Sequence, residues 1–280
     1  MIFLFLPLLV GALLQPTRLP ANIPFLLSAD TSFTVDPLLQ VGEELEYKVS
    51  YSFFSIGTIR IQLLEKSENK GRDVYKAKAI IDSNPSLSWL VDLHIRFYSD
   101  IDTDIFSHEW IGDDSTKSGV SYRRIIFSYD SSRVYFERGK KNMTGERLPS
   151  SVDTVQVSEK CQDGFSLFFL ARKNVRQKKQ MNIPTFIENK QVNTFINFTN
   201  SRTNVDIDAV KYSVEVVEFD GKADYVGVFG LTGGFRGWFS NDEARIPIIA
   251  RMNVILGSIK VELVSWKRHE WMPPRYVEKR

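Results

Sequence analysis

The stretch ELEYKVSYSFFSIGTIRIQL, residues 44–63, decides how the chain folds. In its first part, apolar side chains alternate with polar ones: Leu45, Tyr47, Val49, Tyr51 and Phe53. A period of two is typical of a strand with one buried face. The tripeptide Ser-Ile-Gly at 55–57 is expected to turn the chain, after which the alternation resumes and runs to Leu63. The stretch therefore predicts a β-hairpin.

The same pattern recurs along most of the chain, in short segments separated by turn-forming residues. The segments are DVYKAKAII, LVDLHIRFY, SYRRIIFSYD, RVYFERG, NTFINFT, KYSVEVVEF, DYVGVFG, ARIPIIARMNV and SIKVELVSW. About a dozen strands at this spacing predict a mainly all-β, antiparallel architecture. We expect a large curved sheet or a half-open barrel. The polar segment 139–160 is interpreted as a connection.

One segment, KCQDGFSLFFLARKNVR at 160–176, departs from the strand pattern. Asp163 is a good residue to cap the N-terminus of a helix, and basic residues occur at the other end, where the helix dipole favours them. The residues between them are apolar nearly all round, which is typical of a buried helix. The sequence therefore predicts one buried helix near 163–174, in the concave face of the sheet.

The N-terminal residues MIFLFLPLLVGALL are too few to span a bilayer but suit a secretory signal peptide. The alternative is an apolar core strand. We expect a signal peptide at 1–21, an extended leader at 22–40, a single β-rich domain at 41–266 and a basic tail at 267–280.

Composition excludes several classes of protein. Of 280 residues, 43% are hydrophobic and 25% charged, an ordinary globular balance. The formal net charge is only +2, which argues against nucleic acid as a partner. Cys161 is the only cysteine, so an internal disulfide is impossible, and it is expected to be a small buried residue. The nearest candidate for a basic and aromatic patch is KSGVSYRRIIFSYD, residues 117–130.

Motifs for chemistry are missing from the sequence. It contains no G-x-S-x-G, no H-E-x-x-H, no phosphate-binding glycine loop and no cysteine pair for zinc, so no catalytic residue, metal or cofactor is expected. The three histidines are expected to have surface or packing roles: His94, His108 and His269. A run of acids can share one strand face and suits a cation or a charged sheet edge, of which we favour the edge: Asp100, Asp102 and Asp104.

Three stretches in order resemble the exported bacterial proteins grouped as domain-of-unknown-function family 3108. They are VGEELEYKVSYSFFSIGTIRI (41–61), DGFSLFFLAR (163–172) and GWFSNDEARIPIIARMNVILGSIKVEL (237–263). The resemblance covers roughly residues 38 to 265. The family's description names no activity. It implies an exported, envelope-associated, β-rich protein, placed in the periplasm or elsewhere outside the cytoplasm, commonly in Gram-negative bacteria.

Five residues of these stretches form the candidate ligand or structural site: Asp163, Arg172, Trp238, Asp242 and Arg245. If their polar groups converge in one cleft, an enzyme is favoured; if each makes a separate cap or ion pair, it is not. We interpret 237–263 as a structural corner, with a bend marked by Gly233, Gly234 and Gly237, Asp242 as a turn cap or partner of Arg245, and Pro247 in an edge strand or at the start of a strand.

Three functions remain open, and we rank them by the features that support each. The first is a non-catalytic envelope protein that binds a lipid, an acylated molecule or another amphipathic ligand in the concave face. The second is an envelope assembly component that acts by surface contacts, with peripheral membrane contact through the tail at 267–280. The third is a hydrolase of envelope glycans or lipids. The sequence predicts no oligomeric state.

Overall fold

A computed structural model of the chain describes residues 37–278, except 70, 88–91, 226–230 and 255–256. The chain divides into two units, Met1–Thr34 and Val35–Arg280. The expected signal peptide and most of the expected leader lie outside the described residues. The described elements all belong to the second unit.

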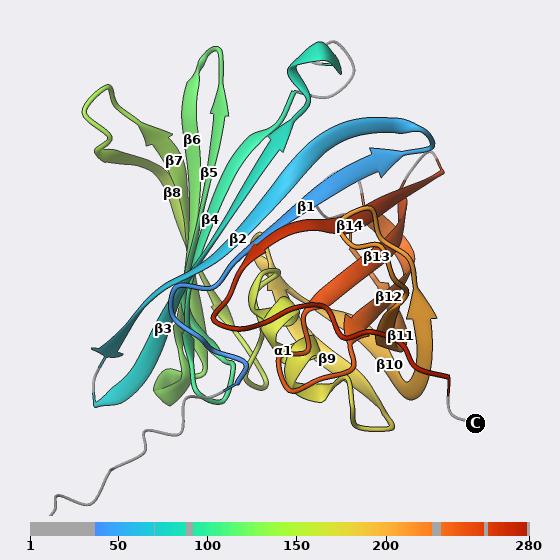
Figure 1. The fold of residues 1–280 in the computed structure, drawn as a ribbon. Coiled ribbons are helices and arrows are strands. Elements are labelled where there is room, and N and C mark those ends of the chain that lie inside the picture. The colour runs from blue at the N-terminus through green and yellow to red at the C-terminus, as the bar shows by residue number, and fades with distance from the viewer. Residues whose placement is uncertain (1–36, 70, 88–91, 226–230, 255–256, 279–280) are drawn as a thin grey trace, which may run out of the picture. The chain divides into compact units, whose positions relative to one another are not determined.

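The second unit is mainly β, as predicted, with strands joined into one antiparallel sheet and a single α-helix among the described residues (Figure 1). The elements are β1 Glu44–Tyr51, β2 Phe54–Asn69, β3 Arg72–Ser83, η1 Pro85–Leu87, β4 His94–Asp102, β5 Ser107–Thr116, β6 Gly119–Ser128, η2 Tyr129–Ser131, β7 Arg133–Lys141, β8 Arg147–Gln156, α1 Ser166–Asn174, β9 Lys179–Ile187, β10 Lys190–Val205, β11 Val214–Ala223, β12 Leu231–Ser240, β13 Pro247–Val254 and β14 Ser258–Lys267.

The sheet has 14 strands and is not closed. Its order is β8-β7-β6-β5-β4-β3-β2-β1-β14-β13-β12-β11-β10-β9, so almost every strand pairs with its neighbours in sequence. Among the described strands, the one pairing between strands distant in sequence joins β1 to β14. The two end strands of the sheet, β8 and β9, are consecutive along the chain, and the segment that joins them carries α1.

The first hairpin forms, but its turn lies earlier than predicted. β1 ends at Tyr51 and β2 begins at Phe54, with Ser52 in the left-handed region at φ 52°. Gly57, expected in the turn, lies inside β2. A Cβ at Gly57 would lie 2.5 Å from the carbonyl oxygen of Asp82 on β3, so this glycine permits a close approach of two strands.

Two further predictions missed a strand, because the side chains of a strand need not alternate between apolar and polar. The region 139–160 was interpreted as a connection but contains β8, an edge strand whose residues are mostly exposed and which has no apolar face to reveal it. Gly233, Gly234 and Gly237, expected to mark a bend, lie within β12, whose pairing with β13 shifts register between Leu231 and Phe235. Gly233 adopts the left-handed region there, at φ 71°. A Cβ at Gly237 would lie 2.3 Å from the ring of Phe219, so the glycine accommodates an aromatic ring in the sheet.

The acidic run in β4 does not mark a sheet edge, because β4 pairs with β3 and β5. Asp102, the last residue of β4, is buried, and its Oδ2 lies 3.0 Å from Nε2 of His108. Its Oδ1 accepts hydrogen bonds from the backbone N–H groups of Asp104 and Phe106. This carboxylate closes the β4–β5 turn.

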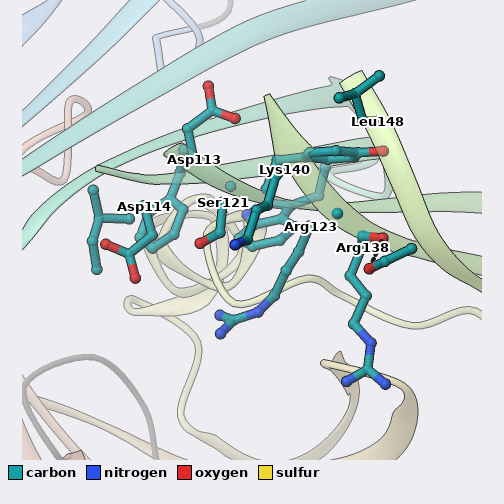
Figure 2. Close-up of a pocket in the computed structure, with 14 residues that line it drawn as sticks. Asp113, Asp114, Ser121, Arg123, Arg138, Lys140 and Leu148 are labelled. Carbon is teal, nitrogen blue, oxygen red and sulfur yellow. Dashed lines mark hydrogen bonds between the residues drawn. The ribbon is translucent and has the colours of Figure 1, made fainter. Parts of the chain in front are cut away.

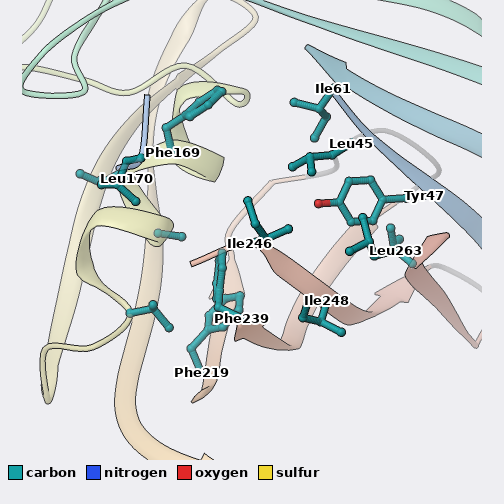
Figure 3. Packing of buried hydrophobic residues seen from close by; sticks show 14 of the residues in the cluster. Leu45, Tyr47, Ile61, Phe169, Leu170, Phe219, Phe239, Ile246, Ile248 and Leu263 are labelled. Carbon is teal, nitrogen blue, oxygen red and sulfur yellow. The ribbon is translucent and has the colours of Figure 1, made fainter. Parts of the chain in front are cut away.

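The face of the sheet that contacts α1 forms most of the core, and we call it the inner face. Figure 3 shows Phe169 and Leu170 of α1 on one side of this core and Leu45 and Tyr47 of β1 on the other. Ile246 lies between them and is fully buried. Burial of such side chains stabilises a fold by about 1.5–3 kcal/mol each.

The described ends of the unit also pack on the sheet. Leu38 and Leu39 are buried in the core, so packing begins before β1. Beyond β14, the indole of Trp271 contacts Trp266, with ring centroids 5.5 Å apart. The backbone N–H of Tyr276 donates to the carbonyl of Ser213. Among the described residues, no helix combines the length and apolarity that crossing a bilayer requires.

Candidate functional site

A row of cross-strand neighbours on the inner face leads from the core to the outer strands. Successive pairings join one residue from each of seven adjacent strands: Leu45, Ile61, Ala79, Phe97, Gly112, Arg123 and Arg138. The first three are buried, Phe97 is half-buried, and both arginines are exposed. The row therefore changes from aliphatic to aromatic to cationic along the sheet. We call it the inner-face row.

The outer part of this row borders a pocket of about 540 Å³ on β4–β8. This volume lies within the range of about 300–1,000 Å³ that is usual for ligand sites. The apolar border consists of Ile95, Phe97, Trp110 and Leu148, and the cations beside it are Arg123, Arg138 and Lys140. The pocket thus offers apolar contact and positive charge side by side.

A glycine creates the apolar floor of the pocket. A Cβ at Gly112 would lie 2.4 Å from Cη2 of Trp110, so the indole occupies the space above this residue. The Trp110 ring also packs against Phe97, with centroids 5.3 Å apart and planes inclined by 34°. Both aromatic side chains remain partly exposed and present their apolar surface to the pocket.

The three cations stand on the same face by register. Arg123 lies directly opposite Arg138, and Lys140 lies opposite Ser121 in the adjacent row. Figure 2 shows the Arg123 and Arg138 side chains extending to the same side of the strands, while Asp113 points the other way. Arg138 donates a hydrogen bond from Nε to Oγ of Ser151 at 2.9 Å. Within the described ranges, none of the three forms an ion pair with an acidic side chain.

The residues predicted as a ligand or structural site make structural contacts, beginning with Asp163. Its Oδ1 accepts hydrogen bonds from the backbone N–H groups of Phe165 and Ser166, and its Oδ2 accepts one from Ser99 Oγ at 2.6 Å. The carboxylate thus holds the start of α1 against β4, as a capping residue does. Burial raises the pKa of Asp163 above its ordinary value, although these hydrogen bonds oppose the shift.

Arg172, near the other end of α1, is fully buried. Its guanidinium donates from Nη1 to Oε1 of Glu43 at 2.6 Å and from Nη2 to Oε2 at 3.0 Å. Nη2 also donates to the carbonyl of Ala244 at 2.9 Å, and Glu43 accepts a further hydrogen bond from Arg268. The cluster joins α1, the start of β1, the β12–β13 turn and the C-terminal segment.

Asp242 and Arg245 both shape the β12–β13 turn, as the structural interpretation of this stretch predicted. Oδ1 of Asp242 accepts from the N–H groups of Ala244 and Arg245, each at 3.0 Å, and Oδ2 accepts from the indole of Trp271 at 2.7 Å. Arg245, at φ 47°, donates from Nη1 to the carbonyl of Lys173 at 3.1 Å, which satisfies the C-terminus of α1.

Trp238 lies on the outer face, because it alternates with the inner-face residues Gly237 and Phe239, and it is half-buried. The five predicted residues therefore do not converge in one cleft. They make a cap, an ion pair, a turn, a helix-end contact and a packing contact. No group of three or more His, Cys, Asp or Glu in the described part of the chain is placed to hold a metal ion.

Sequence reasoning missed the pocket, although part of its signal was visible. The segment 117–130 was recognised as basic and aromatic, and it contains both Arg123 and Arg124. These adjacent residues point to opposite faces of β6, and only the register assigns Arg123 to the pocket. Arg138 and Lys140 lie near the C-terminal end of β7. The sequence pattern gave no indication that the inner face of β7 is exposed there.

The comparisons with known proteins give a family and a fold. The model of a family described as "Protein of unknown function (DUF3108)" matches residues 46–264. No curated protein matches the chain. The crystal structure of a beta-barrel-like protein of domain of unknown function DUF1849 from Brucella abortus is similar, with a TM-score of 0.50 and 11% sequence identity. The match covers 83% of this chain and 100% of that chain, and at this identity it shows the fold alone.

Proposed function

The chain belongs to the DUF3108 family of proteins of unknown function, and we propose that it is a non-catalytic binding protein of the cell envelope. Its ligand is amphipathic, with an apolar part that lies on the inner face of the sheet over β4 and β5. The observation that carries this proposal is the pocket on β4–β8, where Phe97 and Trp110 are partly exposed beside three cations.

The location of the aromatic pair supports a binding role more than a structural one. A side chain needed only for packing is usually buried in the core, as Phe169 is. Phe97 and Trp110 instead pack against the core cluster with one side and border the pocket with the other. Ligand sites are typically lined by such apolar surfaces with a few polar groups at their margin.

Calorimetric titration with a dodecyl-chain amphiphile tests the proposal. We expect saturable binding by the wild-type protein and a loss of about tenfold or more for Phe97→Ser, because the apolar floor is removed. The matched control is Tyr98→Ser, the next residue of β4, whose side chain points to the outer face. Equal affinity in Phe97→Ser and wild type, with both folded, contradicts the proposed site.

We further propose that the protein is exported, on the basis of the apolar residues 1–14. Sequencing the N-terminus of the mature protein, after cell fractionation, tests this part separately. A mature chain that starts near residue 22 in the envelope fraction agrees with it. A chain that keeps Met1 and stays in the cytoplasm contradicts it.

An assembly role through surface contacts is the second candidate, and one observation favours it. Phe53 and Phe54, at the tip of the first hairpin, are 96% and 64% exposed. Replacing both by serine should abolish complex formation in cross-linked envelope preparations if the tip is a contact. Unchanged cross-links count against this role.

A hydrolase is the weakest of the three candidates, because the polar residues singled out for it make separate structural contacts. The carboxylate of Asp242 accepts hydrogen bonds from the β12–β13 turn and from the indole of Trp271, and Arg172 pairs with Glu43. The Asp242→Ala variant should therefore lose stability but keep ligand affinity once folded. A folded Asp242→Ala variant that binds the ligand normally but loses hydrolysis of an envelope glycan or lipid would support the hydrolase.

A further inference from the structure

The charges on the two faces of strands β5–β7 are arranged differently. On the outer face, Arg124 lies opposite Glu137 and donates from Nε to Oε1 of Glu109 at 2.5 Å. On the same face, Lys141 donates from Nζ to Oδ2 of Asp113 at 2.5 Å. Each of these cations therefore has an acidic partner that compensates its charge.

On the inner face the arrangement is reversed, because Arg123 lies directly opposite Arg138. Like charges at directly opposed positions destabilise an antiparallel pair, with Cβ atoms only about 4.5–5.5 Å apart. Lys140, on the next row, adds a third positive charge at the same margin of the pocket. In the ranges that the structure describes, no acidic side chain forms an ion pair with this group of three cations.

One acid borders the same pocket and must be weighed against them. Asp114 lies in the adjacent row, opposite Ser121, which in turn lies opposite Lys140. Two strand spacings, on the order of 9–10 Å, therefore separate Asp114 from Lys140 along that row. Figure 2 shows Asp114 on the far side of Ser121 from Arg138. Asp114 is also a diagonal neighbour of Arg123, with Cβ atoms on the order of 7–8 Å apart, but the two form no ion pair in the described part of the chain. One acid beside three cations leaves this margin of the pocket with an excess of positive charge.

From this contrast we propose that the arginine pair, Arg123 and Arg138, is an anion subsite that binds the phosphate or carboxylate head group of the ligand. The inference rests on the proposed function and adds the class of head group. Arginine forks pair with two oxygens of a carboxylate or phosphate at once, so two facing arginines suit one such group. A bound anion also removes the repulsion that the free pair carries.

The geometry of the inner-face row places the apolar part of the same ligand. Phe97 and Arg138 are separated by three strand spacings, on the order of 14 Å. Gly112 lies between Phe97 and Arg123 in the row, and the Trp110 indole covers it. A ligand with its head at the arginine pair would therefore direct its chain across the Trp110 indole and onto Phe97.

Calorimetry with four probes tests the subsite: dodecyl phosphate, dodecanoate, the uncharged detergent dodecyl maltoside and inorganic phosphate. We expect the wild-type protein to bind the two anionic amphiphiles about 10- to 100-fold more tightly than the uncharged one, as charged hydrogen bonds predict. The Arg123→Gln/Arg138→Gln variant should lose this preference and keep its affinity for the uncharged amphiphile.

The matched control is Arg96→Gln/Arg133→Gln, which removes the same charge from exposed positions on the outer face of β4 and β7. It should bind every probe as the wild type does. A folded arginine-pair variant that retains the anionic preference overturns the subsite, as does an equal loss in the control. Inorganic phosphate that binds as tightly as dodecyl phosphate also overturns it, because the dodecyl chain would then add nothing to binding and the site would be one for free phosphate.

Failure of the subsite and failure of the proposed function give different results. If anionic and uncharged amphiphiles bind equally well and Phe97→Ser weakens both, the apolar site stands and the anion subsite is wrong. If none of the three amphiphiles binds the wild-type protein, the proposed function itself is wrong.

Discussion

Arg172 of the helix and Glu43 at the start of the sheet form a buried, two-pronged ion pair, with N–O distances of 2.6 and 3.0 Å. Arg172 has no exposed side-chain surface, and that of Glu43 is 2% exposed. The two residues are 129 positions apart in sequence, so their contact fixes the helix within the sheet. The pocket lies on β4–β8 and includes neither residue of this ion pair.

Replacing Arg172 by alanine should lower the free energy of unfolding by about 3–5 kcal/mol, because the Glu43 carboxylate is left buried with less compensation. Urea unfolding followed by tryptophan fluorescence measures the change. Lys66→Ala is the control, because its pair with Asp73 is half exposed and such surface pairs contribute little to stability. A loss below about 1 kcal/mol in Arg172→Ala would show that the buried pair does not hold the helix.

Replacing Gly112 by alanine should displace the Trp110 indole, because the new Cβ would lie 2.4 Å from Cη2. The backbone of Gly112 needs no left-handed conformation, so the main effect falls on the pocket floor. We expect the affinity for a dodecyl amphiphile to fall several-fold, with a shift in the fluorescence maximum. Unchanged affinity together with unchanged fluorescence would contradict the described floor.

The contact between Asp102 and His108 should make stability depend on pH. Burial raises the pKa of Asp102, but hydrogen bonds from His108 and from the N–H groups of Phe106 and Asp104 outweigh it, so the net pKa is below its ordinary value. The stabilisation is therefore fully present above the unfolded pKa of about 3.9 and is lost as the pH falls through the lower folded pKa.

Comparison with Asp102→Asn across pH tests this dependence. The variant should be less stable by about 1.5–3 kcal/mol near neutral pH, and the difference should shrink below about pH 4. Urea titrations at a series of pH values give both curves. A difference that is constant down to acid pH would mean that Asp102 acts by packing alone.

Cys161 should be unreactive in the folded protein. Burial raises the pKa of its thiol to about 11, with a smaller contribution from Glu159, so little thiolate forms near pH 8. We expect no reaction with a disulfide reagent such as Ellman's in native buffer and complete reaction in urea. Rapid labelling of the native protein would place the thiol at the surface.

Sequence reasoning predicted the elements whose side chains alternate and missed those whose side chains do not. β1 is recognisable because Leu45, Tyr47 and Val49 are all buried on one face. β8 has little to bury as a free edge, and β12 contains glycines that make room for the rings of neighbouring strands. Strands of these two kinds leave no regular apolar pattern in the sequence.

The capping roles of Asp163 and Asp242 followed from local chemistry, whereas the pocket did not. Asp163 caps a helix within three residues of itself, and Asp242 caps a turn at the same range, so both roles can be predicted from the sequence. The facing of Arg123 and Arg138 depends on the register of β6 and β7. A shift of one residue would move each arginine to the other face, and no local motif specifies that register.

A crystal structure of the protein with 12-bromododecanoate tests the central claim most directly, because bromine can be located by its anomalous signal. We expect a bromine peak over Phe97 or Trp110, with the carboxylate within hydrogen-bonding distance of Arg123 or Arg138. A bound ligand found only on the outer face, or a pocket that stays empty of ligand at saturating concentration, would contradict the proposed binding site.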